Sequence, residues 1–203
     1  MKKCLLVLAA TLAMSSVAMA APVTDIEKGE TNVGYLYWHP KVDFAGESFG
    51  NSNANGFFIE SAVTDKLIVG IETIKGDTSA SFDGDTYNLD TRFTDITVQY
   101  KVADNVRLIA GNRKYEGDLG VAGYGKLMSG SSNKFIYGIS GSTTLGKKTT
   151  GYASVLNNSY GTDWQIGVNQ KINNEITFNV NYRYYDEDYF DLKGIGAGLV
   201  YKF

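Results

Sequence analysis

Histidine, cysteine and proline are almost absent from this chain of 203 residues, which has one histidine, one cysteine and two prolines. A single histidine and a single cysteine leave little material for a zinc site, a disulfide or a nucleophile activated by a base. An excess of basic residues is also missing, because 19 Lys+Arg face 22 Asp+Glu and the formal net charge is −3. Nucleic acid is therefore not an expected partner, since its recognition calls for a basic patch.

Long hydrophobic runs are missing as well. Transmembrane helices need about 20 consecutive apolar residues each, and the apolar run at residues 5–13 is too short. It follows Lys2 and Lys3 and precedes Ala18-Met19-Ala20, which has the small-x-small form that signal peptidase cleaves. These three features predict an N-terminal signal peptide rather than a membrane anchor, and hence an exported protein.

Cleavage is expected after Ala20, with cleavage after Ala21 as the alternative. Cys4 would leave with the signal peptide, so the mature chain would hold no disulfide and no thiolate metal site. The predicted division is a signal peptide at residues 1–20 and one domain at residues 21–203.

Glycine and aromatic residues are plentiful, with 23 glycines, 14 tyrosines and 10 phenylalanines. In most of the chain, apolar residues alternate with small or polar ones. Ile96, Val98 and Tyr100, for example, alternate with Thr97 and Gln99. This period of two predicts β-strands with two unlike faces. The fold class expected is therefore all-β.

The connections between the predicted strands alternate in length. Those near residues 65, 104, 146 and 173 are short. The others are mostly longer, polar and rich in glycine or acidic residues, at 39–55, 75–88, 116–133, 158–162 and 186–191. Short turns at one end and long loops at the other are typical of an up-and-down antiparallel β-barrel of the outer-membrane type. About ten strands are expected, and eight are the alternative because residues 116–156 are the least regular.

The polar face of the predicted strands carries ionised residues in mid-strand. A dry core would bury each of them at a cost of several kcal/mol unless it were paired. The polar face is therefore predicted to line a lumen and the apolar face to meet lipid, whereas a soluble sandwich or lipocalin-like barrel would hide its apolar face inside. The predicted lumen charges are Glu60, Glu72, Asp95, Arg107, Arg113, Lys171 and Arg183.

Aromatic residues near the strand ends support the same orientation. Amphipathic rings of this kind gather at the two interfaces between a membrane and water. The predicted interface aromatics are Tyr35, Tyr37, Trp38, Tyr100, Trp164, Tyr182 and Tyr184.

The chain stops on Leu199-Val200-Tyr201-Lys202-Phe203, in which apolar residues alternate and the last residue is aromatic. This tail resembles the C-terminal signal of bacterial outer-membrane barrels, with Leu199, Tyr201 and Phe203 as its apolar positions. The whole mature chain resembles the small outer-membrane β-barrel class, which includes OmpA-like, OmpW-like and other porin-family barrels. The resemblance implies insertion by the barrel-assembly machinery, location in the cell outer membrane, and contact with outer-membrane lipid and lipopolysaccharide.

Two functions are compatible with such a barrel. The charged lumen predicts a porin-like narrow passive channel for small solutes, or a barrel plugged by its own ion pairs. The plug is favoured over the pore, because small barrels are mostly filled by their own side chains. The alternative is a structural or surface-binding barrel that contacts a partner, not identified by the sequence, through its external loops. An outer-membrane lipid-modifying enzyme is a remote alternative.

Catalysis, cofactors and metal sites find little support. The lone His39 is expected to be an ordinary loop residue, because Asp43 and Ser48 follow it without the spacing of a triad. The glycine-rich run at 120–127 lacks the Ser/Thr of a phosphate-binding loop. The acidic groups near residues 77–85 and 186–191 lack calcium-loop spacing and are expected to be solvated tips. No enzyme activity, cofactor or metal is predicted.

Overall fold

The computed structural model describes residues 23–44, 47–82, 85–159, 161–187 and 190–203. Within these residues, no helix is long and apolar enough to cross a membrane. The ordered elements are strands, namely β1 (Thr31–Phe44), β2 (Glu47–Asn51), β3 (Asn53–Ala62), β4 (Leu67–Phe82), β5 (Asp85–Ala103), β6 (Val106–Val121), β7 (Gly125–Gly146), β8 (Thr149–Asn157), β9 (Gly161–Lys171), β10 (Ile176–Glu187) and β11 (Phe190–Lys202).

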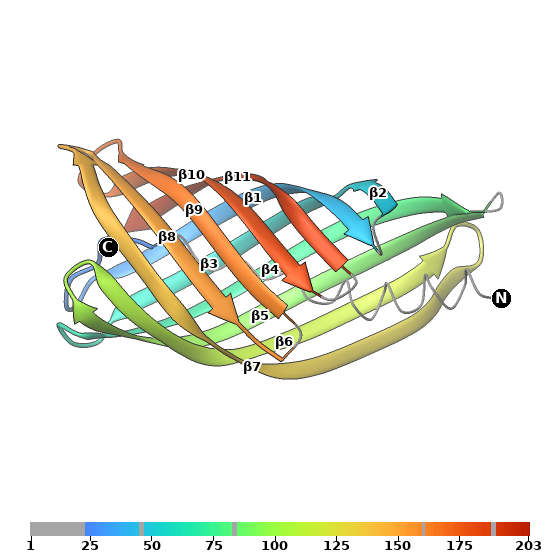
Figure 1. The fold of residues 1–203 in the computed structure, drawn as a ribbon, viewed down its shortest axis with the longest axis horizontal. Coiled ribbons are helices and arrows are strands. Elements are labelled where there is room, and N and C mark those ends of the chain that lie inside the picture. The colour runs from blue at the N-terminus through green and yellow to red at the C-terminus, as the bar shows by residue number, and fades with distance from the viewer. Residues whose placement is uncertain (1–22, 45–46, 83–84, 160, 188–189) are drawn as a thin grey trace.

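The strands form one closed antiparallel barrel (Figure 1). Neighbours along the chain pair with each other, and β11 pairs with β1 from Asn32 opposite Lys202 to Phe44 opposite Phe190. The short β2 pairs with the distal end of β1 and leaves the main wall to β3. The wall therefore contains ten strands. This confirms the predicted fold and rejects the eight-stranded alternative.

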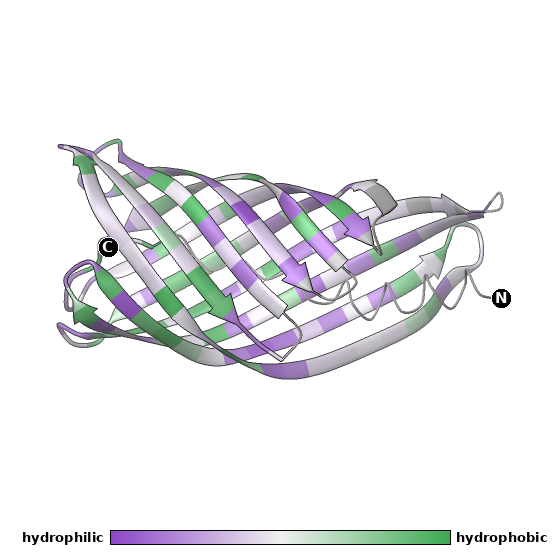
Figure 2. Cartoon of the chain, viewed as in Figure 1, coloured by the Kyte–Doolittle hydropathy of each residue, from purple (hydrophilic) through white to green (hydrophobic). Residues whose placement is uncertain are grey.

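Side chains alternate between the barrel interior and the outer wall. In β3, Phe57 is 58% exposed and its neighbour Phe58 is 1% exposed, and Figure 2 shows hydrophobic and hydrophilic residues alternating along the strands. Large apolar side chains gather on the outer wall, where an outer-membrane barrel requires them because it meets lipid there. They include Ile59, Val69, Ile71, Ile96, Val98, Phe135, Ile139, Ile166 and Val180.

The two ends of the barrel differ. Tight turns join the strands at the end where the C-terminus lies, which is the periplasmic end in barrels of this type (Figure 1). In one of them, Oδ1 of Asn173 accepts hydrogen bonds from the backbone N–H groups of Glu175, at 2.9 Å, and Ile176, at 2.6 Å. An asparagine side chain that bonds to the backbone two and three residues ahead in this way stabilises a tight turn.

At the opposite end the predicted loops are largely strand. Backbone pairing continues to Phe82 opposite Asp85 in the hairpin β4–β5 and, after a register shift between Leu119 and Gly120, to Val121 opposite Gly125 in β6–β7. Both hairpins project beyond the other strands (Figure 1). The predicted loops at 75–88 and 116–133 are thus wrong in extent, as is the one at 39–55, because these polar residues still pair along the backbone. Polar composition marks where the apolar belt ends, and it does not mark where the strand ends.

Gly167 makes room for a tyrosine in the interior. A Cβ on Gly167 would lie 2.6 Å from the ring of Tyr152, whose hydroxyl accepts hydrogen bonds from Gln165 and Asn179. We expect Gly167→Ala to lower the free energy of unfolding by about 1–3 kcal/mol, because overpacking displaces a side chain that is hydrogen-bonded. Urea unfolding of the barrel refolded into lipid vesicles would measure this. Gly141→Ala is the matched control, since its Cβ would meet its nearest atom at 3.7 Å; equal losses in both variants would contradict the explanation.

Candidate functional site

The N-terminal segment, residues 23–30, enters the barrel at its periplasmic mouth. Thr24 donates a hydrogen bond of 2.8 Å to Glu60 of β3 and accepts one of 2.7 Å from Asn32 of β1. The backbone carbonyl of Thr24 accepts a hydrogen bond from Arg107 of β6. On the other side of the barrel, Asn169 of β9 donates a bond of 2.8 Å to the carbonyl of Val23. Because the segment is bonded to both walls, it obstructs this mouth.

The same segment is held by an apolar contact and by two lysines. Ile26 is completely buried against Ala62 and Ile68, and its carbonyl accepts a hydrogen bond from Lys101. Lys171 forms an ion pair of 2.9 Å with Asp25. Lys171 was predicted to lie among the lumen charges. It lies instead at the mouth, with its side chain 42% exposed.

The Asp25–Lys171 pair makes the segment sensitive to acid. The hydrogen bond from Lys171 is the main reason that the pKa of Asp25 lies below its ordinary value. A lowered pKa means that the pair stabilises the fold fully above about pH 4 and stops doing so as the pH falls through the folded-state value. Both groups are partly exposed, so we expect the loss to be under about 1 kcal/mol. The pH dependence of urea unfolding should shrink in Asp25→Asn, and an unchanged dependence would contradict this role.

A chain of paired charges crosses the interior above the N-terminal segment. Arg113 of β6 donates to both carboxylate oxygens of Asp95 of β5, at 2.8 and 2.7 Å. It also lies 3.8 Å from Asp163 of β9, which itself accepts two hydrogen bonds from Arg183 of β10. The contact between Arg113 of β6 and Asp163 of β9 spans the lumen, because β7 and β8 separate these two strands in the wall. The lumen is therefore bridged at this level.

Asp163 was not among the predicted lumen charges. It lies one inward step before Gln165, so the period of two that placed Gln165 inside would also have placed Asp163 inside. The predicted loop at 158–162 ends one residue before Asp163 and hides this signal. Asp163 pairs with Arg183, and Asp95 pairs with Arg113. The contact between Asp163 and Arg113 joins the two pairs.

An apolar layer lies next to the ionic chain. The guanidinium of Arg183 is 5.6 Å from the ring centre of Trp38, and Phe93 meets Tyr115 edge-on at 5.7 Å. Trp38 was predicted to be an interface aromatic. That is wrong, because side chains alternate along the strand. Tyr35 and Tyr37 point outward, so Trp38 points inward, where it is 0% exposed. The layer consists of Leu36, Trp38, Val42, Ala54, Phe58, Ile74, Phe93, Tyr115, Tyr185, Leu192 and Val200.

The remaining predicted aromatics and the tail lie on the outer wall. Tyr35, Tyr37, Tyr100, Trp164 and Tyr182 are 39–46% exposed, and Trp164 stacks edge-on with Tyr184 at 5.4 Å. In the tail, Leu199, Tyr201 and Phe203 all face outward.

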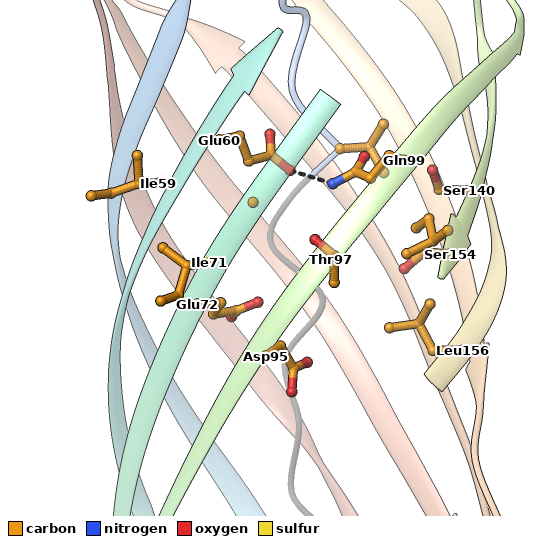
Figure 3. Close-up of a pocket in the computed structure, with 13 residues that line it drawn as sticks. Ile59, Glu60, Ile71, Glu72, Asp95, Thr97, Gln99, Ser140, Ser154 and Leu156 are labelled. Atoms are coloured by element: carbon orange, nitrogen blue, oxygen red, sulfur yellow. Dashed lines mark hydrogen bonds between the residues drawn. The ribbon is translucent and has the colours of Figure 1, made fainter. Parts of the chain in front are cut away.

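Glu72 differs from the other interior charges because none of the residues that the structure describes pairs with it. Its Oε1 has no hydrogen bond, and none of the described lysines or arginines forms an ion pair with it. By contrast, Glu60 accepts a hydrogen bond of 2.8 Å from Gln99, which in turn accepts one from Arg107. Glu60, Glu72, Asp95, Gln99 and Val23 line a cavity of about 30 Å³ (Figure 3), enough for about one water molecule.

The outer wall of the projecting hairpins forms a polar groove of about 820 Å³. Lys126 forms an ion pair of 2.7 Å with Asp118, and Ser129 donates a hydrogen bond of 2.8 Å to it. The hydrogen bond from Lys126, followed by that from Ser129, lowers the pKa of Asp118 below its ordinary value. Strand register aligns the other charges in two rows. One row contains Lys75, Arg92 and Glu116, and the other Asp77, Asp90 and Asp118.

The residues considered for catalysis and metal binding make other contacts where the structure describes them. His39 lies within β1 rather than in a loop, and its Nδ1 is 2.9 Å from Oδ1 of Asn53. Asp43 forms ion pairs with Lys41 and Lys193. Among the described residues, no group of three or more His, Cys, Asp or Glu side chains is placed to hold a metal ion. Asp83 and Asp188, from the two acidic groups, lie outside the described residues.

Solved structures share this architecture. The translocator domain of the autotransporter NalP from Neisseria meningitidis is 10% identical with a TM-score of 0.58, over 97% of this chain and 93% of that one. Ail, the attachment invasion locus protein of Yersinia pestis, solved with the heparin analogue sucrose octasulfate, is 11% identical with a TM-score of 0.50, over 87% and 99%. The COG4313 outer membrane channel from Pseudomonas putida F1 is 9% identical with a TM-score of 0.51, over 91% and 100%. At identities near 10%, these structural matches show a common fold and nothing further.

No curated protein matches the chain in sequence. The family model described as "Outer membrane protein beta-barrel domain" matches residues 6–203. Since this match spans nearly the whole chain, the protein belongs to the outer membrane protein beta-barrel domain family.

Proposed function

We propose that this integral outer-membrane β-barrel acts at the cell surface through its projecting hairpins and does not conduct solutes as a porin. The ionic chain across the lumen carries the proposal. Arg113 and Arg183 are both 0% exposed and share Asp163, so a solute would have to break buried ion pairs in order to pass. The N-terminal segment is a second obstruction in series with the first.

The hairpins β4–β5 and β6–β7 supply the surface for contact. Their groove holds Lys75, Arg92 and Lys126 against Asp77, Asp90, Glu116 and Asp118. Carboxylates outnumber cations, so the groove suits a partner of mixed charge and disfavours a polyanion. The sulfated ligand of Ail is therefore not the ligand that we propose here, although Ail, an attachment invasion locus protein, supports a role in attachment for a barrel of this fold.

We further propose that the protein is not an enzyme. His39, the only histidine in the sequence, is exposed on the outer wall and contacts an amide rather than a carboxylate. General-base catalysis by histidine normally uses a second group that orients the ring. Among the described residues, Asn53 is the hydrogen-bond partner that His39 has, and it also accepts from Tyr37.

Single-channel recording in a planar bilayer tests the proposal. The refolded wild-type protein should give no discrete conductance steps. A matched preparation with both hairpins shortened to the level of Gly76 and Gly117, which keeps Arg113 and Tyr115, should stay equally silent, because the barriers lie within the barrel. Regular steps from the wild type would reject the proposal and favour the porin-like channel.

A further inference from the structure

The outer half of β7 has a sheet edge that its neighbour β8 does not reach, and we propose that this edge binds an extended polypeptide segment of a partner protein as an added strand. β7 contains 22 residues and β8 contains 9. Their pairing runs from Tyr137 opposite Asn157 toward the periplasmic turn, and β7 continues outward past the end of β8 (Figure 1). The proposal rests on the surface function proposed above and names the class of partner for it.

The contacts of Asn158 end the neighbouring hairpin at this level. Its backbone N–H donates a hydrogen bond of 3.0 Å to the carbonyl of Gly161, and its Oδ1 accepts one of 3.3 Å from the N–H of Gly161. Its side-chain amide also donates one of 3.2 Å to the hydroxyl of Tyr115, in the apolar layer. Among the described strands, therefore, none pairs with residues 128–136 of β7 on the side away from β6.

The register identifies the backbone groups that face this side. Asn105 and Ser142 continue the register of β6 and β7, and the N–H of Ser142 donates a hydrogen bond of 2.9 Å to the carbonyl of Asn105. Bonded and non-bonded pairs alternate along an antiparallel ladder, so the even-numbered residues of β7 from 128 to 136 bond to β6. The odd-numbered residues point one N–H and one C=O each away from β6. They are Ser129, Ser131, Asn133 and Phe135.

The side chains along this edge leave the backbone accessible. Residues 129–132 are Ser, Gly, Ser and Ser, and residues 128–136 contain no proline and one charge, Lys134, which strand alternation places on the interior face. Natural sheets usually protect an exposed edge with proline, charge or a covering segment. The hydroxyl of Ser129 bonds to Asp118 of β6 and so turns away from the edge. What remains is a row of donors and acceptors that repeats every two residues, the pattern that a polypeptide strand matches.

The outward side chains beside the edge specify the partner further. Phe135 and Tyr137 are 63% and 54% exposed, and their rings stack 6.2 Å apart. Farther out, the outward residues of the edge are polar. Aromatic residues pair well across strands with aromatic or β-branched residues, and hydroxyl-bearing residues with one another. The bound segment should therefore carry a large apolar residue opposite Phe135 and Ser or Thr at the positions that follow. Because the apolar belt ends at Phe135, this segment approaches from outside the cell.

Binding of a defined peptide to the barrel in detergent micelles tests the proposal. The probe is a fluorescent peptide in which one Phe is followed by Thr at every second position, with Ser between them. Antiparallel addition places the Phe opposite Phe135 and the Thr residues opposite Asn133, Ser131 and Ser129. N-methylation of the Phe and Thr nitrogens removes the donors that face β7 and should weaken binding at least about tenfold. N-methylation of the Ser nitrogens, which face away, should change it less than about twofold.

Two variants at one position supply the matched comparison. Ser131→Pro removes an N–H that faces the open side and not β6, so the barrel should keep the shift in electrophoretic mobility on heating that marks a closed barrel. Its affinity for the peptide should fall at least about tenfold, because an edge strand tolerates proline but loses the bond and the space for a neighbour. Ser131→Ala keeps the backbone and should bind as the wild type does.

Three results would overturn the proposal. They are absence of peptide binding, equal effects of N-methylation on the two sets of nitrogens, and self-association of the wild type that Ser131→Pro abolishes without any peptide binding, which would assign the edge to a second copy of the chain. Any of these, combined with silence in planar bilayers, would leave the surface function to the polar groove. Conductance steps from the wild type would instead reject the surface function itself.

Discussion

Asp163→Ala should lower the free energy of unfolding by about 3–5 kcal/mol, the usual cost of removing one partner from a buried ion pair. Arg183 donates to both oxygens of this carboxylate, and Arg113 lies 3.8 Å from it. Its loss would strand the charge of Arg183 and remove a contact of Arg113. Urea unfolding followed by tryptophan emission would measure the change, and Trp38, 5.6 Å from the Arg183 guanidinium, would report on the same region.

Two comparisons isolate the charge in this experiment. Asp163→Asn keeps the size of the side chain and should be nearly as destabilising, because the amide cannot accept two charge-assisted bonds as the carboxylate does. Asp90→Ala removes an exposed aspartate and should change the free energy of unfolding by less than about 0.5 kcal/mol. If Asp163→Ala behaved like Asp90→Ala, water in the lumen would be solvating the arginines and the ionic chain would not be structural.

The strands of the barrel wall and their two faces could be predicted from sequence, because both depend on residues that are neighbours in the chain. A period of two follows from strand geometry, and the cost of burying ionised side chains decided which face is lipid-facing. The same reasoning placed Glu60, Glu72, Asp95, Arg107, Arg113 and Arg183 inside, where the structure also has them. Trp38 was misplaced because aromatic character was given more weight than strand alternation, although the outward Tyr35 and Tyr37 already place Trp38 on the inward face.

The interior contacts could not be predicted in the same way. Arg113 and Asp163 are 50 positions apart in sequence, on strands that are not neighbours in the sheet, and their approach depends on the diameter and tilt of the closed barrel. The N-terminal segment gave no periodic signal either. Residues 23–30 are too few to show a pattern, and their place in the periplasmic mouth follows from contacts with β3, β5, β6 and β9 together.

The projecting hairpins show a further limit of composition. Polar, glycine-containing stretches such as 75–82 usually indicate loops, yet here backbone pairing continues through them. Each residue added to an existing hairpin still loses conformational entropy, but its backbone hydrogen bonds join a ladder that is already formed, and little further loop-closure entropy is lost. The length of the strands is thus set by pairing, while the apolar belt is set by the side chains, and the two need not end together.

Opening the lumen should require two changes, because the obstructions act in series. Arg113→Ala alone removes the bridge across the interior and leaves the N-terminal segment bonded to both walls. Deletion of residues 21–27 alone clears the mouth and leaves the bridge intact. Each single variant should remain silent in planar bilayers, whereas the combined variant should give discrete steps that favour cations, since Glu72, Asp95 and Asp163 would then line the path without Arg113.

The silent variants must be shown to be folded for this comparison to hold, and the shift in electrophoretic mobility on heating, which reports a closed barrel, provides that check. A matched double variant that joins the same deletion to Lys114→Ala, on the outer wall beside Arg113, should stay silent. Steps from Arg113→Ala alone would mean that the N-terminal segment does not obstruct the mouth. Silence of the combined variant would place the barrier in the apolar layer around Trp38 and Tyr115, where dewetting rather than ion pairing would keep ions out.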